Sequence, residues 1–120
     1  MIRRMTSTTD TNDFVKWDIW VAKVWYDDHS GWKIRPVMIL DGSRCLVLSV
    51  GITSHSPREN YEGEYLIIDW KEAGLDHQST LRLGDLLNIK KDNFRQRIGR
   101  LSDRDINNVL EMMRSSYSKR

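Results

Sequence analysis

The sequence predicts a mainly β domain that ends in one helix, and three observations lead to this fold class. Short runs rich in β-branched residues recur along the first hundred residues and are separated by turn residues. The clearest helical period follows Ser102. A chain of 120 residues is long enough for one hydrophobic core but not for two. We therefore expect a polar N-terminal tail over residues 1–13 and a single domain over residues 14–117.

Two apolar runs in the middle of the chain predict a β-hairpin. They are Val37–Leu40 and Cys45–Val50, joined by an Asp-Gly turn at residues 41–44. Antiparallel pairing should bring Arg35, where the first strand begins, close to Thr53, where the second ends. A guanidinium beside the hydroxyls of Thr53 and Ser54 is suited to binding a phosphate. The alternative is that Arg35 is an edge-strand charge and Thr53 an ordinary strand threonine.

The other expected elements follow from turn residues and hydrophobic patterning. We expect strands at residues 17–26, 64–70, 79–89 and 95–101, loops at residues 27–31 and 54–63, and a single turn at residues 71–75. Nearly every residue from Trp17 to Tyr26 is apolar, which fits a strand covered on both faces or one strongly bent in a small barrel. Gly84 predicts a break or bulge within its strand.

The final helix has both a start signal and a periodic apolar face. Ser102 is a suitable N-cap, and the carboxylates of the first turn favour the helix dipole. The apolar stripe consists of Ile106, Val109, Leu110 and Met113. This stripe is expected to pack on the sheet, with the helix ending near Ser115 or Ser116.

Charge and cysteine content limit the class of protein. The net charge is only +2, but residues 89–104 hold six cations against two acids, so either a polyanion or protection of a strand edge would explain them. The one cysteine, Cys45, excludes an internal disulfide and a cysteine-rich zinc site, and is expected to be buried. No apolar run approaches the length of a membrane span, and no secretory signal is visible. These features predict a cytoplasmic protein without membrane contact.

Five segments, in this order, resemble signature segments of the MazF/PemK toxin family. They are Trp17–Ala22, Ile34–Leu40, Gly51–Ser54, Gly74–Ser79 and Arg97–Ser102. The similarity extends roughly from Lys16 to Met113. It implies an SH3-like small barrel of the CcdB/PemK type with a C-terminal helix, usually as a homodimer.

The resemblance also implies a function. Such a protein is the toxin of a type II toxin–antitoxin system, a sequence-selective endoribonuclease that cuts single-stranded RNA without a metal or other cofactor. A cognate antitoxin blocks its site, and operator DNA is reached only through the antitoxin.

Site residues are carried over by position. Arg35 and Thr53 match the most characteristic catalytic positions, and Ser54 and Arg82 match positions that assist. Two departures leave the general base open. Gly84 stands where such members have a carboxylate, with the acid at Asp85 instead, and the loop at residues 27–31 lacks the usual Gly-rich segment.

The chemistry of metal-free RNA cleavage can be argued directly. The neighbouring 2′-hydroxyl attacks the phosphorus, so the site needs a base, an acid and cations to stabilise the phosphorane. The pKa of arginine suits Arg35 to the electrostatic role more than to proton transfer. Candidates for proton transfer are His29, His55, Arg82 and Asp85. The two histidines lie in loops that should border the site, although either could be an ordinary solvated side chain.

RNA contacts are expected from Trp32, Lys33 and Arg82. Trp32 is placed in the loop before Arg35, whereas the other four tryptophans are expected in the core. These are Trp17, Trp20, Trp25 and Trp70. Two other functions compete: a non-catalytic small-barrel binder of RNA or protein, and a homodimeric subunit of an antitoxin-bound repressor.

Overall fold

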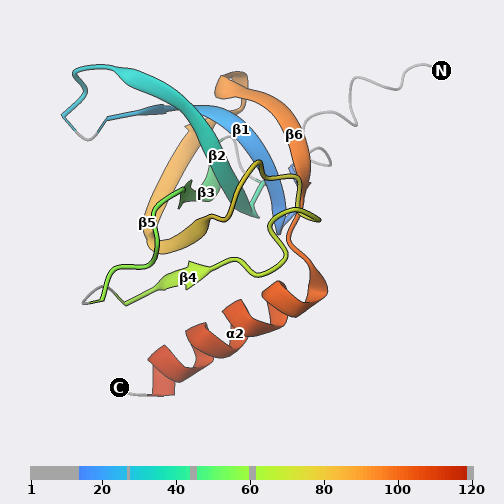
Figure 1. Ribbon diagram of the computed structural model, residues 1–120. Coiled ribbons are helices and arrows are strands. Elements are labelled where there is room, and N and C mark those ends of the chain that lie inside the picture. Colours follow the sequence, from blue (N-terminus) through green and yellow to red (C-terminus); the bar gives the residue numbers. More distant parts are fainter. Residues whose placement is uncertain (1–13, 27, 44–45, 60–61, 119–120) are drawn as a thin grey trace.

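The computed structural model describes residues 14–26, 28–43, 46–59 and 62–118. The predicted tail and Cys45 lie outside these ranges. Within them the chain forms one antiparallel sheet of six strands in the order β4-β5-β3-β2-β1-β6 and a C-terminal α-helix (Figure 1). The elements are β1 (Asp18–Trp25), β2 (Trp32–Asp41), β3 (Leu46–Thr53), β4 (Glu64–Leu66), β5 (Thr80–Lys90), β6 (Phe94–Arg100) and α2 (Asp103–Ser118), with a short 3-10 turn at Lys91–Asn93. The mainly β fold with a final helix is confirmed.

The central hairpin is confirmed, because β2 and β3 pair antiparallel with Val37 opposite Gly51. The first strand of this hairpin, β2, is longer than expected, so Arg35 lies inside it and not at its start. Trp32, expected in a loop, is instead the first residue of β2 and pairs with Trp25. The physical reason is that β1 runs to Trp25 and provides a ladder partner for the residues before Arg35.

The first strand, β1, is both covered and bent, so the two alternatives for residues 17–26 hold together. Ile19 is buried in one hydrophobic cluster, and Ala22 and Val24 are buried in a second. The register between β1 and β6 shifts just before Trp20 and again just after Val21. The sheet therefore curls and buries side chains on each of its faces, as in a small barrel (Figure 1).

Strand β5 confirms the predicted bulge, whereas β4 is shorter than expected. The register between β3 and β5 shifts between Val50 and Gly51, whose partners are Leu86 and Arg82, so Gly84 lies in the skipped segment. The strand expected over residues 64–70 ends at Leu66, and residues 68–74 form turns. That expectation was wrong because the backbone beyond Leu66 bonds to the helix.

Helix α2 begins as predicted, where Ser102 Oγ accepts a bond of 3.1 Å from the backbone N–H of Asp105. It ends at Ser118, slightly later than expected. The predicted stripe is only partly buried, because Ile106 and Val109 are buried but Leu110 and Met113 are 38% and 45% exposed. The fully buried carboxylate of Asp105 lies on the inward face beside Ile106 and Val109, so this face is shifted away from Leu110 and Met113.

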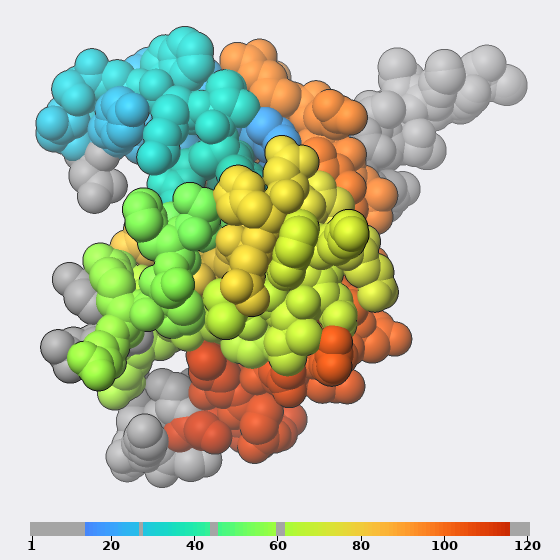
Figure 2. Space-filling model, in the orientation of Figure 1, coloured from blue at the N-terminus to red at the C-terminus, as the bar shows by residue number. Residues whose placement is uncertain are grey.

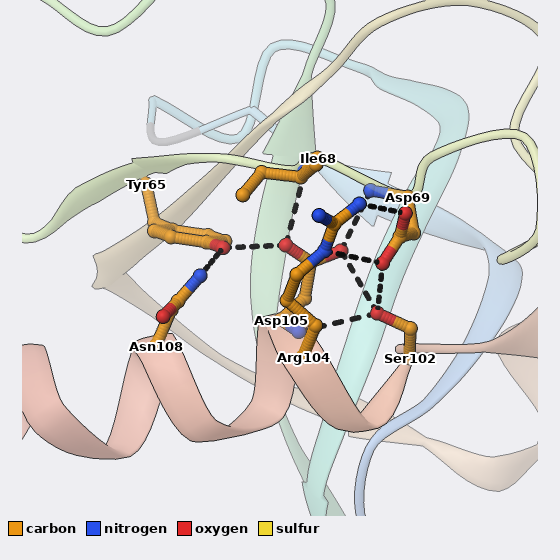
Figure 3. A network of polar contacts seen from close by, with 7 residues as sticks. All are labelled: Tyr65, Ile68, Asp69, Ser102, Arg104, Asp105 and Asn108. Carbon is orange, nitrogen blue, oxygen red and sulfur yellow. Dashed lines mark hydrogen bonds and ion pairs between the residues drawn. The ribbon is translucent and has the colours of Figure 1, made fainter.

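A polar network joins this carboxylate to the segment after β4 (Figure 3). Asp105 accepts hydrogen bonds from the hydroxyl of Tyr65, from the N–H of Ile68 at 3.0 Å, from the N–H of Asp69 at 2.8 Å and from Ser102 Oγ at 3.2 Å. Two backbone N–H groups that a longer strand would have used are thereby satisfied by the helix. This explains why β4 ends early.

The hydroxyl of Tyr65 makes the free energy of unfolding depend on pH in the alkaline range. Burial first, and the hydrogen bond to Asp105 second, raise the pKa of its hydroxyl from 10.0 to about 12. The folded state favours the neutral phenol, so this contribution is complete below pH 10 and is lost as the pH rises towards about 12. We expect the free energy of unfolding, measured with urea, to fall more steeply in this range for the wild type than for Tyr65→Phe. Equal slopes for the two proteins would contradict the assignment.

No helix in the described ranges has the combined length and apolar character that a membrane crossing needs.

Candidate functional site

Arg35 lies in β2 two residues before Val37, where the ladder between β2 and β3 begins opposite Gly51. Its Nη2 donates a hydrogen bond of 3.2 Å to the carbonyl of Ile52, which holds the half-buried guanidinium against the end of β3. Burial lowers the pKa of Arg35, the charge of Asp85 opposes this shift, and the charge of Arg82 adds to it. The cation is therefore fixed in place and shares its surroundings with one acid and a second arginine.

Thr53 ends β3 and forms a pair with His55. Thr53 Oγ1 and His55 Nδ1 are 3.0 Å apart, and the backbone N–H of His55 lies 3.4 Å from the same oxygen. The hydroxyl of Thr80 donates a bond of 2.5 Å to the carbonyl of His55, which fixes the backbone of this residue. The structure thus joins a predicted phosphate-binding hydroxyl to a candidate for proton transfer.

A pocket of about 410 Å³ brings these residues together. Arg35, Thr53, Ser54 and His55 line it, as the hairpin prediction requires. In Figure 2 the cyan, green and yellow segments that contribute to it meet on the visible face. Lys33 also lines this pocket.

Sequence reasoning did not place Asp76 and His77 at the site, yet both line the same pocket. They follow a turn that packs against β6. A Cβ on Gly74 would lie 2.1 Å from the carbonyl oxygen of Ile98, and Gly74 has a φ of +94°, so only glycine suits this close approach. The glycine in the signature-like segment at residues 74–79 was the available signal.

A second pocket, of about 170 Å³, adjoins the other side of Arg35. Lys33, Arg82 and Asp85 line it, so three cations and one carboxylate gather around a small space. Arg82 Nε lies 3.4 Å from a carboxylate oxygen of Glu64. This charged pocket is suited to a phosphate next to the one held by Arg35.

Gly51, which has no side chain, leaves room for the carboxylate of Asp85 in this second pocket. A Cβ at position 51 would lie 2.5 Å from Asp85 Oδ2 and 3.5 Å from Arg35 Nη2. The acid and the arginine therefore approach one another across a space that any side chain at residue 51 would occupy.

His29 is placed elsewhere. It adopts a φ of +62° in the turn after β1 and lines a third pocket that includes neither Arg35 nor Thr53.

Trp25, expected in the core, is 48% exposed, because β1 continues past Ala22, its last residue paired with β6. Lys23 Nζ lies over the rings of Trp25 and Trp32, at 4.9 Å and 4.5 Å from their centroids.

Half of the cations in the segment at residues 89–104 form ion pairs. Arg97 lies 2.9 Å and Arg100 3.8 Å from Asp18, and Arg104 lies 2.6 Å from Asp69. Half of its six cations thus bind acids from other parts of the chain, which favours the structural explanation over a polyanion site.

In the ranges described, no three His, Cys, Asp or Glu side chains gather in a way that could hold a metal ion.

A curled antiparallel sheet with a C-terminal helix and a cationic pocket at the end of its central hairpin defines a small-barrel protein. Residues 16–117 match the family model of the PemK-like, MazF-like toxins of type II toxin–antitoxin systems. The chain belongs to this family, and its family partner is an antitoxin. A comparison with curated proteins finds no match.

Proposed function

We propose that the protein is a sequence-selective endoribonuclease that cuts single-stranded RNA without a metal. The 2′-hydroxyl attacks the adjacent phosphorus, the bond to the 5′-oxygen breaks, and the products carry a 2′,3′-cyclic phosphate and a 5′-hydroxyl. The observation that carries this proposal is the fixed guanidinium of Arg35 in one pocket with the Thr53–His55 pair.

Arg35 stabilises the charge that develops on the phosphorane oxygens, since its fork of donors is held in place before the RNA binds. The hydroxyls of Thr53 and Ser54 bind the same phosphate. Lys33 and Arg82 bind the neighbouring phosphate, and Trp32 contacts the RNA beside them. Asp85 orients Arg35 by its charge.

Proton transfer is assigned to His55, whose ring nitrogen is held 3.0 Å from Thr53 Oγ1. An imidazole is suited to both steps because its unperturbed pKa is near 6.5. It takes the proton of the attacking hydroxyl or supplies one to the leaving oxygen, and His77 in the same pocket is available for the complementary step.

The partners follow from this proposal. The protein acts in the cytoplasm as a homodimer, a segment of the cognate antitoxin occupies the RNA site, and the toxin reaches operator DNA only through the antitoxin. The domain comprises residues 14–117.

The test is to incubate the purified protein with a long single-stranded RNA in EDTA and to identify the ends of the fragments. We expect discrete fragments with cyclic phosphate and 5′-hydroxyl ends, and a loss of cutting of about tenfold or more in Thr53→Ala. Ends with a 3′-hydroxyl and a 5′-phosphate, or intact RNA, would contradict the mechanism.

Gly51→Ala should slow cleavage, because the new methyl group would occupy the place of Asp85 Oδ2 and turn the carboxylate away from Arg35. We expect a loss of roughly three- to tenfold in the single-turnover rate, of the order of one lost electrostatic contact. Gly84→Ala is the matched control, since a Cβ there meets nothing within 4 Å. Equal rates for Gly51→Ala and Gly84→Ala would show that Asp85 does not act on Arg35.

A further inference from the structure

The third pocket, of about 390 Å³, lies between the outer part of β1 and the end of β5. Its polar lining consists of the two carboxamides of Asn88 and Asn93, together with Lys23 and His29. Trp25 provides an aromatic side chain, and no carboxylate of the described residues lines the space. The pocket therefore combines an aromatic surface with amide donors and acceptors, in neutral to positive surroundings.

This pocket adjoins the charged pocket next to Arg35. Val24, Trp25 and Leu87 line both spaces. In Figure 1 the outer parts of β1 and β2 extend beyond the rest of the sheet, on the side of β5. A flexible ligand whose phosphate binds at Lys33 and Arg82 can thus place its next group against Trp25 and the amides.

The two asparagine side chains of this pocket are not engaged by the protein. Among the described residues, the side chains of Asn88 and Asn93 make no hydrogen bond. The ladder between β1 and β6 ends at Ala22, so the edge of β1 that continues from Lys23 is unpaired in the described chain. Amides and backbone groups beside an exposed tryptophan are available to a ligand with its own donors and acceptors.

We infer that this pocket binds one nucleobase of the RNA beside the cleaved bond and sets part of the sequence preference, an inference that rests on the proposed function. A carboxamide presents a donor and an acceptor side by side, which matches the edge of a base, and asparagine pairs in this way with adenine. Single-stranded RNA is recognised through unstacked bases that lie on aromatic side chains and bond through their edges. Trp25 stacks on the base while Asn88 and Asn93 bind its edge.

The test measures binding of short 2′-O-methyl oligoribonucleotides, which cannot be cut, by fluorescence anisotropy. Starting from the tightest binder, each position is varied through the four bases. We expect the wild type to prefer one base by about tenfold or more at one position, as for a well-formed amide–base contact. Asn88→Ala and Asn93→Ala should reduce this preference to about twofold, and thermal unfolding should confirm that both remain folded.

Asn107→Ala is the matched control, because Asn107 is an exposed asparagine on α2, and it should keep the full preference. Loss of the preference in the two pocket variants alone supports the inference, whether or not the wild type cuts RNA. An unchanged preference overturns it, even if the variants weaken binding of an antitoxin peptide. A wild type that discriminates but does not cut contradicts only the proposed cleavage, whereas one that binds no oligoribonucleotide overturns both proposals.

Discussion

Arg35→Ala should lower the rate of RNA cleavage by about 100- to 1000-fold, the loss typical of removing one fixed donor that stabilises a developing oxyanion. The guanidinium is held in place by the carbonyl of Ile52 before RNA binds, so little reorganisation is needed at the moment of reaction. Removing this side chain leaves Lys33 as a cation in the same pocket, and Arg82 on the side of the second pocket only. The measurement is a single-turnover rate on a short RNA that contains one mapped cut site.

Two further variants serve as controls. One separates the charge of Arg35 from its planar geometry, and the other tests whether removing any exposed arginine slows cleavage. Arg35→Lys keeps the positive charge but loses the planar fork, and should fall between the wild type and Arg35→Ala. Arg95→Ala removes an exposed arginine on β6 and should leave the rate unchanged. The hydrogen bond to Ile52 contributes about 1 kcal/mol to stability, so Arg35→Ala should remain folded at room temperature. A folded Arg35→Ala protein with the full rate would disprove the assigned role.

The placement of Arg35 and Thr53 in one pocket could be predicted because it depends on local rules. An antiparallel hairpin brings its two outer ends together, so the hydrophobic pattern and one Asp-Gly turn are sufficient. Asp76 and His77 could not be placed in this way. Their position depends on the contact between Gly74 and Ile98, residues that are distant in sequence.

The fold shows the same division between local and tertiary causes. The hairpin, the bulge at Gly84 and the N-cap of the helix have local signals, and all three are confirmed. The length of β4 and the exposure of Leu110 depend on where one buried carboxylate finds its donors. A periodic stripe shows that a helix has an apolar face, but a buried polar network can rotate that face relative to the core.

Asp105→Ala should destabilise the folded domain severely. The side chain is fully buried and accepts bonds from two backbone N–H groups, the hydroxyl of Tyr65 and Ser102 Oγ. Alanine would leave the two backbone N–H groups and the Tyr65 hydroxyl without this acceptor, and each donor left unsatisfied costs about 1–3 kcal/mol. Ser102 Oγ would keep Asp69 Oδ2 as an acceptor at 2.7 Å. We expect the free energy of unfolding, measured with urea at neutral pH, to fall by about 3–5 kcal/mol, a large part of the stability of a small domain.

Asp103→Ala provides the matched control, because Asp103 lies in the same first turn but is exposed. It loses only a favourable interaction with the helix dipole and should cost less than about 1 kcal/mol. Similar losses in the two variants would show that the helix dipole, and not the buried network, anchors α2. A large loss in Asp105→Ala alone would mean that this carboxylate holds both the helix and the turn leading to Gly74, and with it the wall of the pocket that contains His77.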